Sequence, residues 1–155
     1  MNDAIVSLEG VDKRFASGLL ALSDIGLQVA PGEFVTLIGP SGCGKSTVLR
    51  LAAGLEVPSA GRIDAPALTS AAAQTAFVFQ EPTLMPWASV FDNVWLPLRL
   101  AGASRSAART NVAAVLAAVG LGEFAAAFPN ELSGGMKMRV SIARALVTRP
   151  QLLLM

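Results

Sequence analysis

The sequence predicts an α/β fold, and three consecutive features near residue 40 carry that prediction. Phe34 to Ile38 form a wholly apolar run, which is typical of a strand buried in a parallel sheet. The glycine-rich segment GPSGCGKST follows at residues 39–47. Beyond it, apolar side chains recur at helical spacing until Gly54, which is placed to cap the helix. A strand, a glycine loop and a helix in this order indicate an α/β unit.

The remaining patterns predict further strands and helices on both sides of this unit. A helix is expected from Ser104 to Val119, and another begins at the N-cap Ser133 and stops at Arg149-Pro150. Prolines at positions 82, 86 and 97 predict a loop region. Strands are expected at residues 4–8, 25–29, 61–64, 76–79 and 151–155. No repeat or linker divides the chain, so we expect a single unit.

Composition limits the class of protein only loosely. The 155 residues are 53% hydrophobic, yet no stretch reaches about 18 uninterrupted apolar residues, so we expect no membrane span. The net charge is +1 and the 12 basic residues are scattered, which argues against a nucleic-acid partner. The N-terminus does not read as a secretion signal. A single cysteine, Cys43, excludes an internal disulfide, and the cytoplasm is the expected compartment.

The segment GPSGCGKST has the spacing of a phosphate-binding loop and lies in the expected context between a strand and a helix. Its glycines let backbone N–H groups turn inward, and the following helix directs its positive end at a phosphate. A plain strand-to-helix turn would not require a lysine and a serine side by side. The predicted loop residues are Gly39, Pro40, Ser41, Gly42, Cys43, Gly44, Lys45, Ser46 and Thr47.

Individual roles follow from the chemistry of a bound ATP. We assign Lys45 to the β- and γ-phosphates, Ser46 to a Mg²⁺ ion and Thr47 to the α-phosphate side. Phe15 is a candidate stacking platform for adenine, and the alternative is an ordinary core aromatic. Cys43 is expected to be a small loop residue rather than a nucleophile, because the chain contains no histidine to act as its base.

A phosphate loop alone leaves kinases, GTPases, helicases and transporters open, and two further segments discriminate among them. ELSGGMKMRVSIARAL, at residues 131–146, contains a second glycine-bearing helix start at Ser133, Gly134 and Gly135. This segment resembles the signature motif of the ABC ATPase family, with LSGGM in place of the commoner LSGGQ. Gln80, in FVFQEP, is similar to the family's Q-loop glutamine.

The resemblance extends from Phe15 through the signature segment. It implies the ABC type of P-loop NTPase fold, with an antiparallel N-terminal β part, parallel core strands and a helical subdomain at about residues 88–146. It also implies that ATP lies between the phosphate loop of one subunit and the signature segment of a second, so that two subunits form a homodimer. Ser46 and Gln80 are then the residues expected at Mg²⁺.

Within this family, EPTLMPWASVFDNVWLPLRL together with LSGGM resembles the ATP-binding subunits of importers for nitrate, sulfonates or taurine. The resemblance implies transmembrane permease partners, an indirect link to a periplasmic solute-binding protein and a peripheral location on the cytoplasmic face of the inner membrane. Leu84, Met85 and Trp87 suit the docking of a permease helix. The alternative is a packed cluster with Phe91 and Trp95.

The family pattern continues beyond the apolar run QLLLM into an aspartate, a glutamate and a later histidine, and none of these occurs before Met155. We therefore expect residues 1–155 to be one incomplete domain, truncated at its C-terminus, that binds ATP but hydrolyses it negligibly alone. Two alternatives remain. One is a non-hydrolysing regulatory module, and the other is a soluble ABC ATPase acting on DNA or ribosomes, against which stands the short spacing from Gln80 to Ser133.

Overall fold

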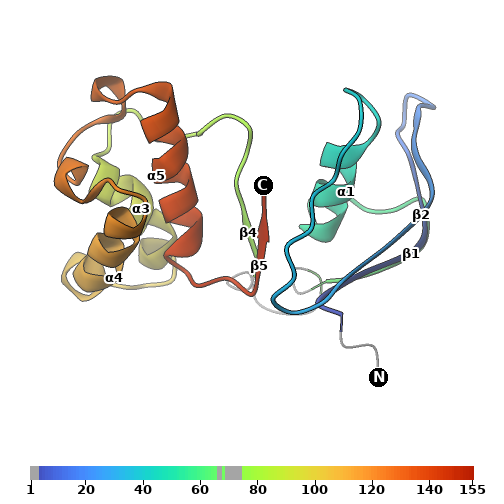
Figure 1. Ribbon diagram of the computed structural model, residues 1–155, viewed down its shortest axis with the longest axis horizontal. Coiled ribbons are helices and arrows are strands. Elements are labelled where there is room, and N and C mark those ends of the chain that lie inside the picture. The colour runs from blue at the N-terminus through green and yellow to red at the C-terminus, as the bar shows by residue number, and fades with distance from the viewer. Residues whose placement is uncertain (1–3, 66–67, 69–74) are drawn as a thin grey trace. The chain divides into compact units, whose positions relative to one another are not determined.

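The computed structural model describes residues 4–65, 68 and 75–155, and the chain forms two compact units (Figure 1). The first unit takes in the residues up to Thr75 together with Leu154, and the second takes in Ala76 to Leu153 with Met155. No helix in the described part of the chain is both long enough and apolar enough to cross a lipid bilayer.

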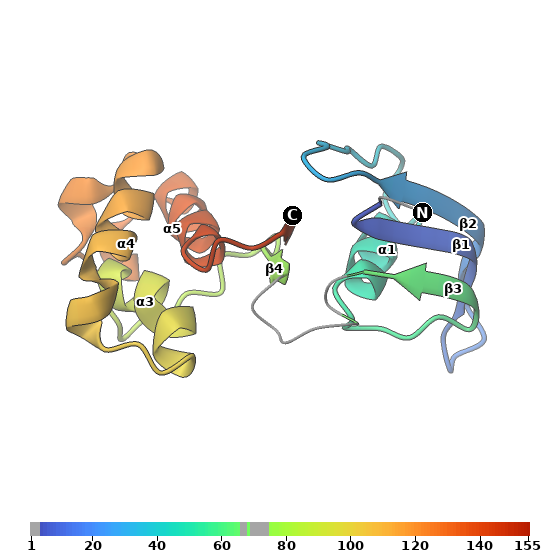
Figure 2. The same cartoon turned by 90° about the horizontal axis from the view of Figure 1, so that it is seen from below.

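A three-stranded antiparallel sheet forms the frame of the first unit (Figure 2). Its strand order is β2-β1-β3, where β1 is Val6–Arg14, β2 is Leu20–Val29 and β3 is Ala60–Asp64. Helix α1, Lys45–Ala52, lies against one face of this sheet. The helix buries Val48, Leu51 and Ala52, which is the face that helical spacing predicts.

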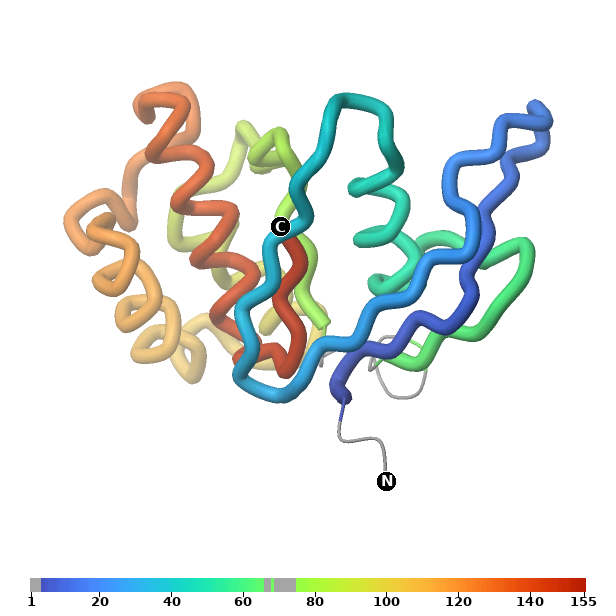
Figure 3. Tube along the Cα trace, turned by 45° about the vertical axis from the view of Figure 1, so that its right-hand side comes forward, coloured from blue at the N-terminus to red at the C-terminus, as the bar shows by residue number. Residues whose placement is uncertain are grey.

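The segment from Phe34 to Ile38 corrects the prediction of a buried strand. It connects β2 to α1 without forming a strand, and its path can be followed in Figure 3. The Phe34 and Ile38 side chains are 84% and 92% exposed. A strand requires a neighbour that pairs with its N–H and C=O groups, and the described strands pair with one another instead. An apolar run alone therefore did not determine a strand here.

Three helices pack together in the second unit. They are α3, Val90–Leu100, α4, Arg105–Ala118, and α5, Gly134–Leu146, with 3₁₀ turns at Gly122–Phe124 and Pro129–Glu131. Their shared core is made by Val90 and Val94, Val112 and Leu116, and Val140 and Ala143. A short two-stranded sheet joins β4, Thr75–Phe77, to β5, Leu152–Leu154.

Helix α3 is a second correction, because the prolines predicted a loop region where the structure forms eleven helical residues that include Pro97. A proline removes one backbone hydrogen bond from a helix and normally interrupts it. Here Ser89 caps the helix by accepting a hydrogen bond from the Asp92 N–H, while Val90 and Val94 are fully buried. Capping and apolar burial outweigh the cost of the proline.

Candidate functional site

The glycine loop at residues 39–47 has a conformation that needs glycine. Gly42 and Gly44 have φ angles of 82° and 98°, in the left-handed region that L-residues rarely adopt. Gly44 also lies directly against β2, since a Cβ added there would come within 2.5 Å of the Leu22 side chain and 2.8 Å of the Ala21 carbonyl oxygen. Backbone angle and close packing together fix the loop beside the hairpin of the first unit.

Lys45 holds a positive charge inside this loop. Its Nζ donates hydrogen bonds to the carbonyl oxygens of Gly39 and Pro40, at 2.7 and 2.8 Å, and lies 3.5 Å from the Cys43 Sγ. These acceptors are neutral, and no salt bridge forms at Lys45 within the described residues. Because Lys45 is also the first residue of α1, its ammonium adds to the positive end of the helix. The loop is therefore suited to an anion.

The residues present fit Mg²⁺ only in combination with phosphates. Ser46 is exposed on the first turn of α1 and offers one hydroxyl oxygen. Among the described residues, no group of three or more His, Cys, Asp or Glu side chains gathers to hold a metal. Protein Mg²⁺ sites of the nucleotide type use one or two protein oxygens and take other ligands from phosphates and water. Ser46 matches that limited donor set.

Phe15 lies directly after β1, in the tight turn that leads to β2. Its N–H donates to the Leu19 carbonyl at 2.9 Å, and its own carbonyl accepts from the Gly18 N–H at 2.8 Å. The side chain is half-buried, and the Nζ of Lys13 lies 5.2 Å from the ring centroid. The structure thus brings Phe15 and the phosphate loop onto the same unit, with β2 in contact with Gly44.

The start of α5 provides a second open helix terminus. Ser133 is the N-cap, and its Oγ accepts a hydrogen bond from the Met136 N–H at 3.3 Å. Ser133, Gly134 and Gly135 are all exposed, and no atom lies within 4 Å of a Cβ added at either glycine. The start of α5 at Gly134 and Gly135 is therefore accessible to an anionic ligand.

Gln80 lies in the second unit with this helix start, three residues beyond the end of β4, and is exposed. The loop after it is held by Arg144 of α5, which was not among the predicted site residues. The Arg144 guanidinium donates to the carbonyl oxygens of Pro82 and Thr83 at 3.0 and 2.9 Å, and to the Thr83 hydroxyl at 2.9 Å. Desolvation by burial lowers the pKa of Arg144 from its usual value.

Asn93 is a second residue that the sequence did not single out, and it is fully buried. Its Oδ1 accepts from the Met85 N–H at 2.8 Å, and its Nδ2 lies within 3.1 Å of the carbonyl oxygens of Met85, Ala88 and Ser89. These contacts attach the loop that contains Trp87 to helix α3. The sequence gives no signal for such contacts, because the acceptors are backbone atoms that every residue has.

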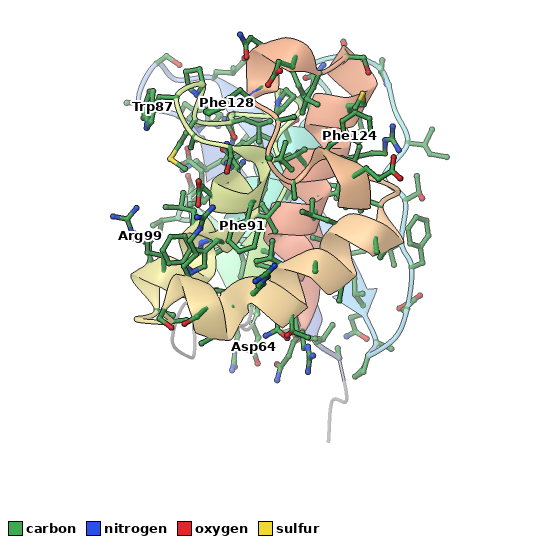
Figure 4. The ribbon with its side chains drawn as sticks, turned by 90° about the vertical axis from the view of Figure 1, so that its left-hand side faces the viewer. Asp64, Trp87, Phe91, Arg99, Phe124 and Phe128 are labelled. Carbon is green, nitrogen blue, oxygen red and sulfur yellow. The ribbon has the colours of Figure 1, made fainter. Side chains whose placement is uncertain are left out.

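The aromatic residues of this region separate into two groups (Figure 4). Phe91 and Trp95 pack against the helical core, beneath the guanidinium groups of Arg105 and Arg99. Trp87 is 78% exposed. The packed-cluster alternative therefore holds for Phe91 and Trp95, whereas Trp87 remains available at the surface.

A phosphate-type loop before α1 and an open, glycine-bearing start of α5 define a nucleotide-binding protein of the P-loop class. The family model described as ABC transporter matches residues 22–155. The chain belongs to the ABC transporter family, in which nucleotide binding is the shared property.

Curated relatives show which members of that family the chain is similar to. The chain is 47% identical over 147 residues to the aliphatic sulfonates import ATP-binding protein SsuB 1 of Mesorhizobium japonicum, covering 95% of this chain and 55% of that protein. It is 46% identical over 155 residues to the protein of the same description from Burkholderia lata, covering 100% and 46%. The chain spans about half the length of the curated relatives it matches.

Solved structures show the same fold. The chain superposes on cbiO1 of Clostridium perfringens, part of an ABC transporter complex, with a TM-score of 0.86 and 28% identity over 97% of this chain and 64% of that one. It superposes on the dimeric structure of MJ0796, a bacterial ABC transporter cassette, with a TM-score of 0.82 and 35% identity over 96% and 72%. The predicted ABC-type fold, with an antiparallel N-terminal sheet, parallel strands and helices, is confirmed.

Proposed function

We propose that this chain is the ATP-binding part of an energy-coupling subunit of an ABC importer for sulfonate-type solutes, in the nitrate, sulfonate and taurine group. The observation that carries the proposal is the presence of two glycine-bearing helix starts, at Lys45 and at Ser133, on one polypeptide. The solute class rests on two relatives, at 47% and 46% identity, that are aliphatic sulfonates import ATP-binding proteins.

Two anion sites on one chain favour a ligand shared between two subunits. One helix terminus contributes about 0.3–2 kcal/mol, whereas micromolar binding requires about 8 kcal/mol. Lys45 supplies a mobile charge and Ser46 one oxygen ligand for Mg²⁺, and ATP·Mg²⁺ brings the phosphates that complete the metal's coordination. The Ser133 helix start of a second copy adds further N–H donors, so the homodimer and nucleotide binding support one another. Gln80, a residue of the second unit, is proposed as a further contact to Mg²⁺.

The proposed partners on the membrane side are transmembrane permease subunits, which place the chain peripherally on the cytoplasmic face of the inner membrane. Trp87 is a suitable anchor because it combines an exposed indole with a loop that Asn93 holds rigidly. An aromatic side chain on a pre-ordered loop loses little conformational entropy on binding. A periplasmic solute-binding protein would act through the permease rather than on this chain.

The nucleotide site is tested by replacing Lys45 with alanine and measuring the binding of ATP and of inorganic tripolyphosphate by calorimetry in the presence of Mg²⁺. A charge-assisted hydrogen bond contributes about 1.5–3 kcal/mol, so both affinities should fall about 10- to 100-fold. Arg50→Ala is the matched control, because it removes a positive charge from the other end of the same helix. Equal binding by the Lys45→Ala and Arg50→Ala variants would contradict the proposed site.

A further inference from the structure

Lys13 is the charged residue among the buried polar residues of the described part of the chain, and the assigned nucleotide contacts do not include it. The residue is 9% exposed and lies near the C-terminal end of strand β1, two residues before Phe15. Its Nζ forms a salt bridge of 2.8 Å with the Glu56 Oε2 and donates a hydrogen bond of 2.7 Å to the Val57 carbonyl oxygen. A buried ammonium is retained at a cost in desolvation, so its position requires a reason.

The ammonium of Lys13 also lies over the ring of Phe15, at 5.2 Å from the centroid. This distance is within the range of an attractive cation–π contact. Glu56 and the Val57 carbonyl oxygen bind the same ammonium, so three contacts fix its position. The Phe15 side chain is only half-buried, so part of the ring is accessible for stacking.

The same contacts connect Phe15 to the helix that carries the phosphate loop. Glu56 and Val57 follow the C-terminal end of α1, which spans about 12 Å from Lys45 to Ala52. Ser59 adds a second connection, because its Oγ accepts from the Arg14 N–H at 2.9 Å and its own N–H donates to the Asp12 carbonyl at 2.8 Å. The turn with Phe15 is thereby tied to the segment after α1.

We propose that Lys13 is a positioning residue for the nucleotide base: its buried ammonium, held by Glu56 and the Val57 carbonyl, presents Phe15 at a fixed separation from the phosphate loop. This inference rests on the proposed function, because it assumes that Phe15 stacks on the base of ATP. A cation behind the ring also makes the ring electron-poor, which favours stacking on an electron-rich purine. Lys13 therefore affects binding of the base and not of the phosphates.

The experiment compares two probes, ATP and inorganic tripolyphosphate, which lacks a base. The test variant is Lys13→Met combined with Glu56→Gln, because the double change leaves no unpaired charge where the salt bridge was. Its ATP affinity should fall about 3- to 10-fold while its tripolyphosphate affinity stays that of the unaltered chain. Lys13→Arg keeps a cation beside the ring, so it should retain most of the preference for ATP.

A double-mutant cycle with Phe15→Leu separates positioning from general stabilisation. In the Phe15→Leu background, loss of Lys13 should no longer change the ratio of ATP to tripolyphosphate affinity. A parallel fall in both affinities, no fall in either, or an undiminished Lys13 effect without the Phe15 ring would overturn the inference and leave the Lys45 site intact. Failure of the unaltered chain to bind either probe would overturn the proposed function as well.

Discussion

Arg144 is a cation whose hydrogen bonds all go to neutral acceptors. Its guanidinium reaches two carbonyl oxygens and one hydroxyl of the loop at Pro82 and Thr83, and it also donates to the Ser141 Oγ at 3.3 Å. Thr83 has a φ of 46°, a conformation that a residue with a branched Cβ rarely adopts. The planar, multidentate donor therefore holds in place a backbone conformation that would otherwise relax.

Arg144→Lys should show how much this geometry matters, because lysine keeps the charge but not the planar arrangement of donors. We expect the free energy of unfolding to fall by about 1–3 kcal/mol, as for a buried hydrogen-bonded charge that loses partners. Urea denaturation measures the change. Arg139→Lys is the matched control on the same helix, since the exposed Arg139 donates a hydrogen bond to the Val119 carbonyl oxygen at 3.0 Å. Equal destabilisation by both changes would show that the Arg144 contacts contribute nothing particular.

Helix α3 and the loop before it behave as one element because Asn93 joins them. The fully buried amide satisfies the Met85 N–H and bonds to carbonyl oxygens at both ends of residues 85–89. The loop therefore presents Trp87 to solvent without being loose itself. Rigidity of the loop and exposure of the indole depend on different residues, which makes them separable by mutation.

Asn93→Leu retains the side-chain volume but leaves buried backbone groups unsatisfied, so it should lower the free energy of unfolding by about 2–4 kcal/mol. Trp87→Ala removes an exposed side chain and should change that free energy by less than about 0.5 kcal/mol. If Trp87 is the permease anchor, the same variant should lose assembly with the permease in a pull-down while binding ATP normally. Unchanged assembly would exclude the docking role.

Local signals and non-local contacts explain which elements the sequence predicted. The helices α1, α4 and α5 were anticipated because their caps and apolar spacing lie within a few residues of one another. Phe34 to Ile38 was predicted wrongly because strand pairing depends on distant segments. Helix α3 was not predicted because Pro97 normally interrupts a helix. Burial of one face of the helix outweighs the cost of that proline. The strand expected at residues 25–29 proved to be the end of the longer strand β2, and the one expected at residues 4–8 overlaps only the start of β1.

The same distinction applies to the candidate site. Glycine spacing identified the loop at residues 39–47 and the start of α5, and most residues of both are exposed, as an anion site requires. The sequence did not predict the roles of Arg144, Asn93 and Lys13. Each of them acts through contacts with backbone or side-chain atoms that residue spacing does not reveal. The partners of Arg144 are 61 and 62 residues away in sequence, and the Val57 partner of Lys13 is 44 residues away.

At the scale of the whole molecule, the two helix starts belong to different compact units. Lys45 lies in the first unit with Phe15, whereas Ser133 lies in the second with Gln80. A change at one start can therefore be made without altering the unit that carries the other. This separation allows the proposed sandwich of nucleotide between two copies to be tested apart from nucleotide binding by a single copy.

Gly135→Asp places a carboxylate in the first turn of α5, where it stabilises the helix by about 0.3–1 kcal/mol but repels a triphosphate. The unaltered chain should sediment as a dimer when ATP and Mg²⁺ are added, and this variant should remain a monomer under the same conditions. At dilutions where the unaltered chain is also monomeric, the two should bind ATP equally, because Lys45 and its loop are unchanged. Ser106→Asp, an equivalent charge in the exposed first turn of α4, should still dimerise. Dimerisation of the Gly135→Asp variant equal to that of the Ser106→Asp variant would show that the start of α5 does not face the nucleotide of a second copy.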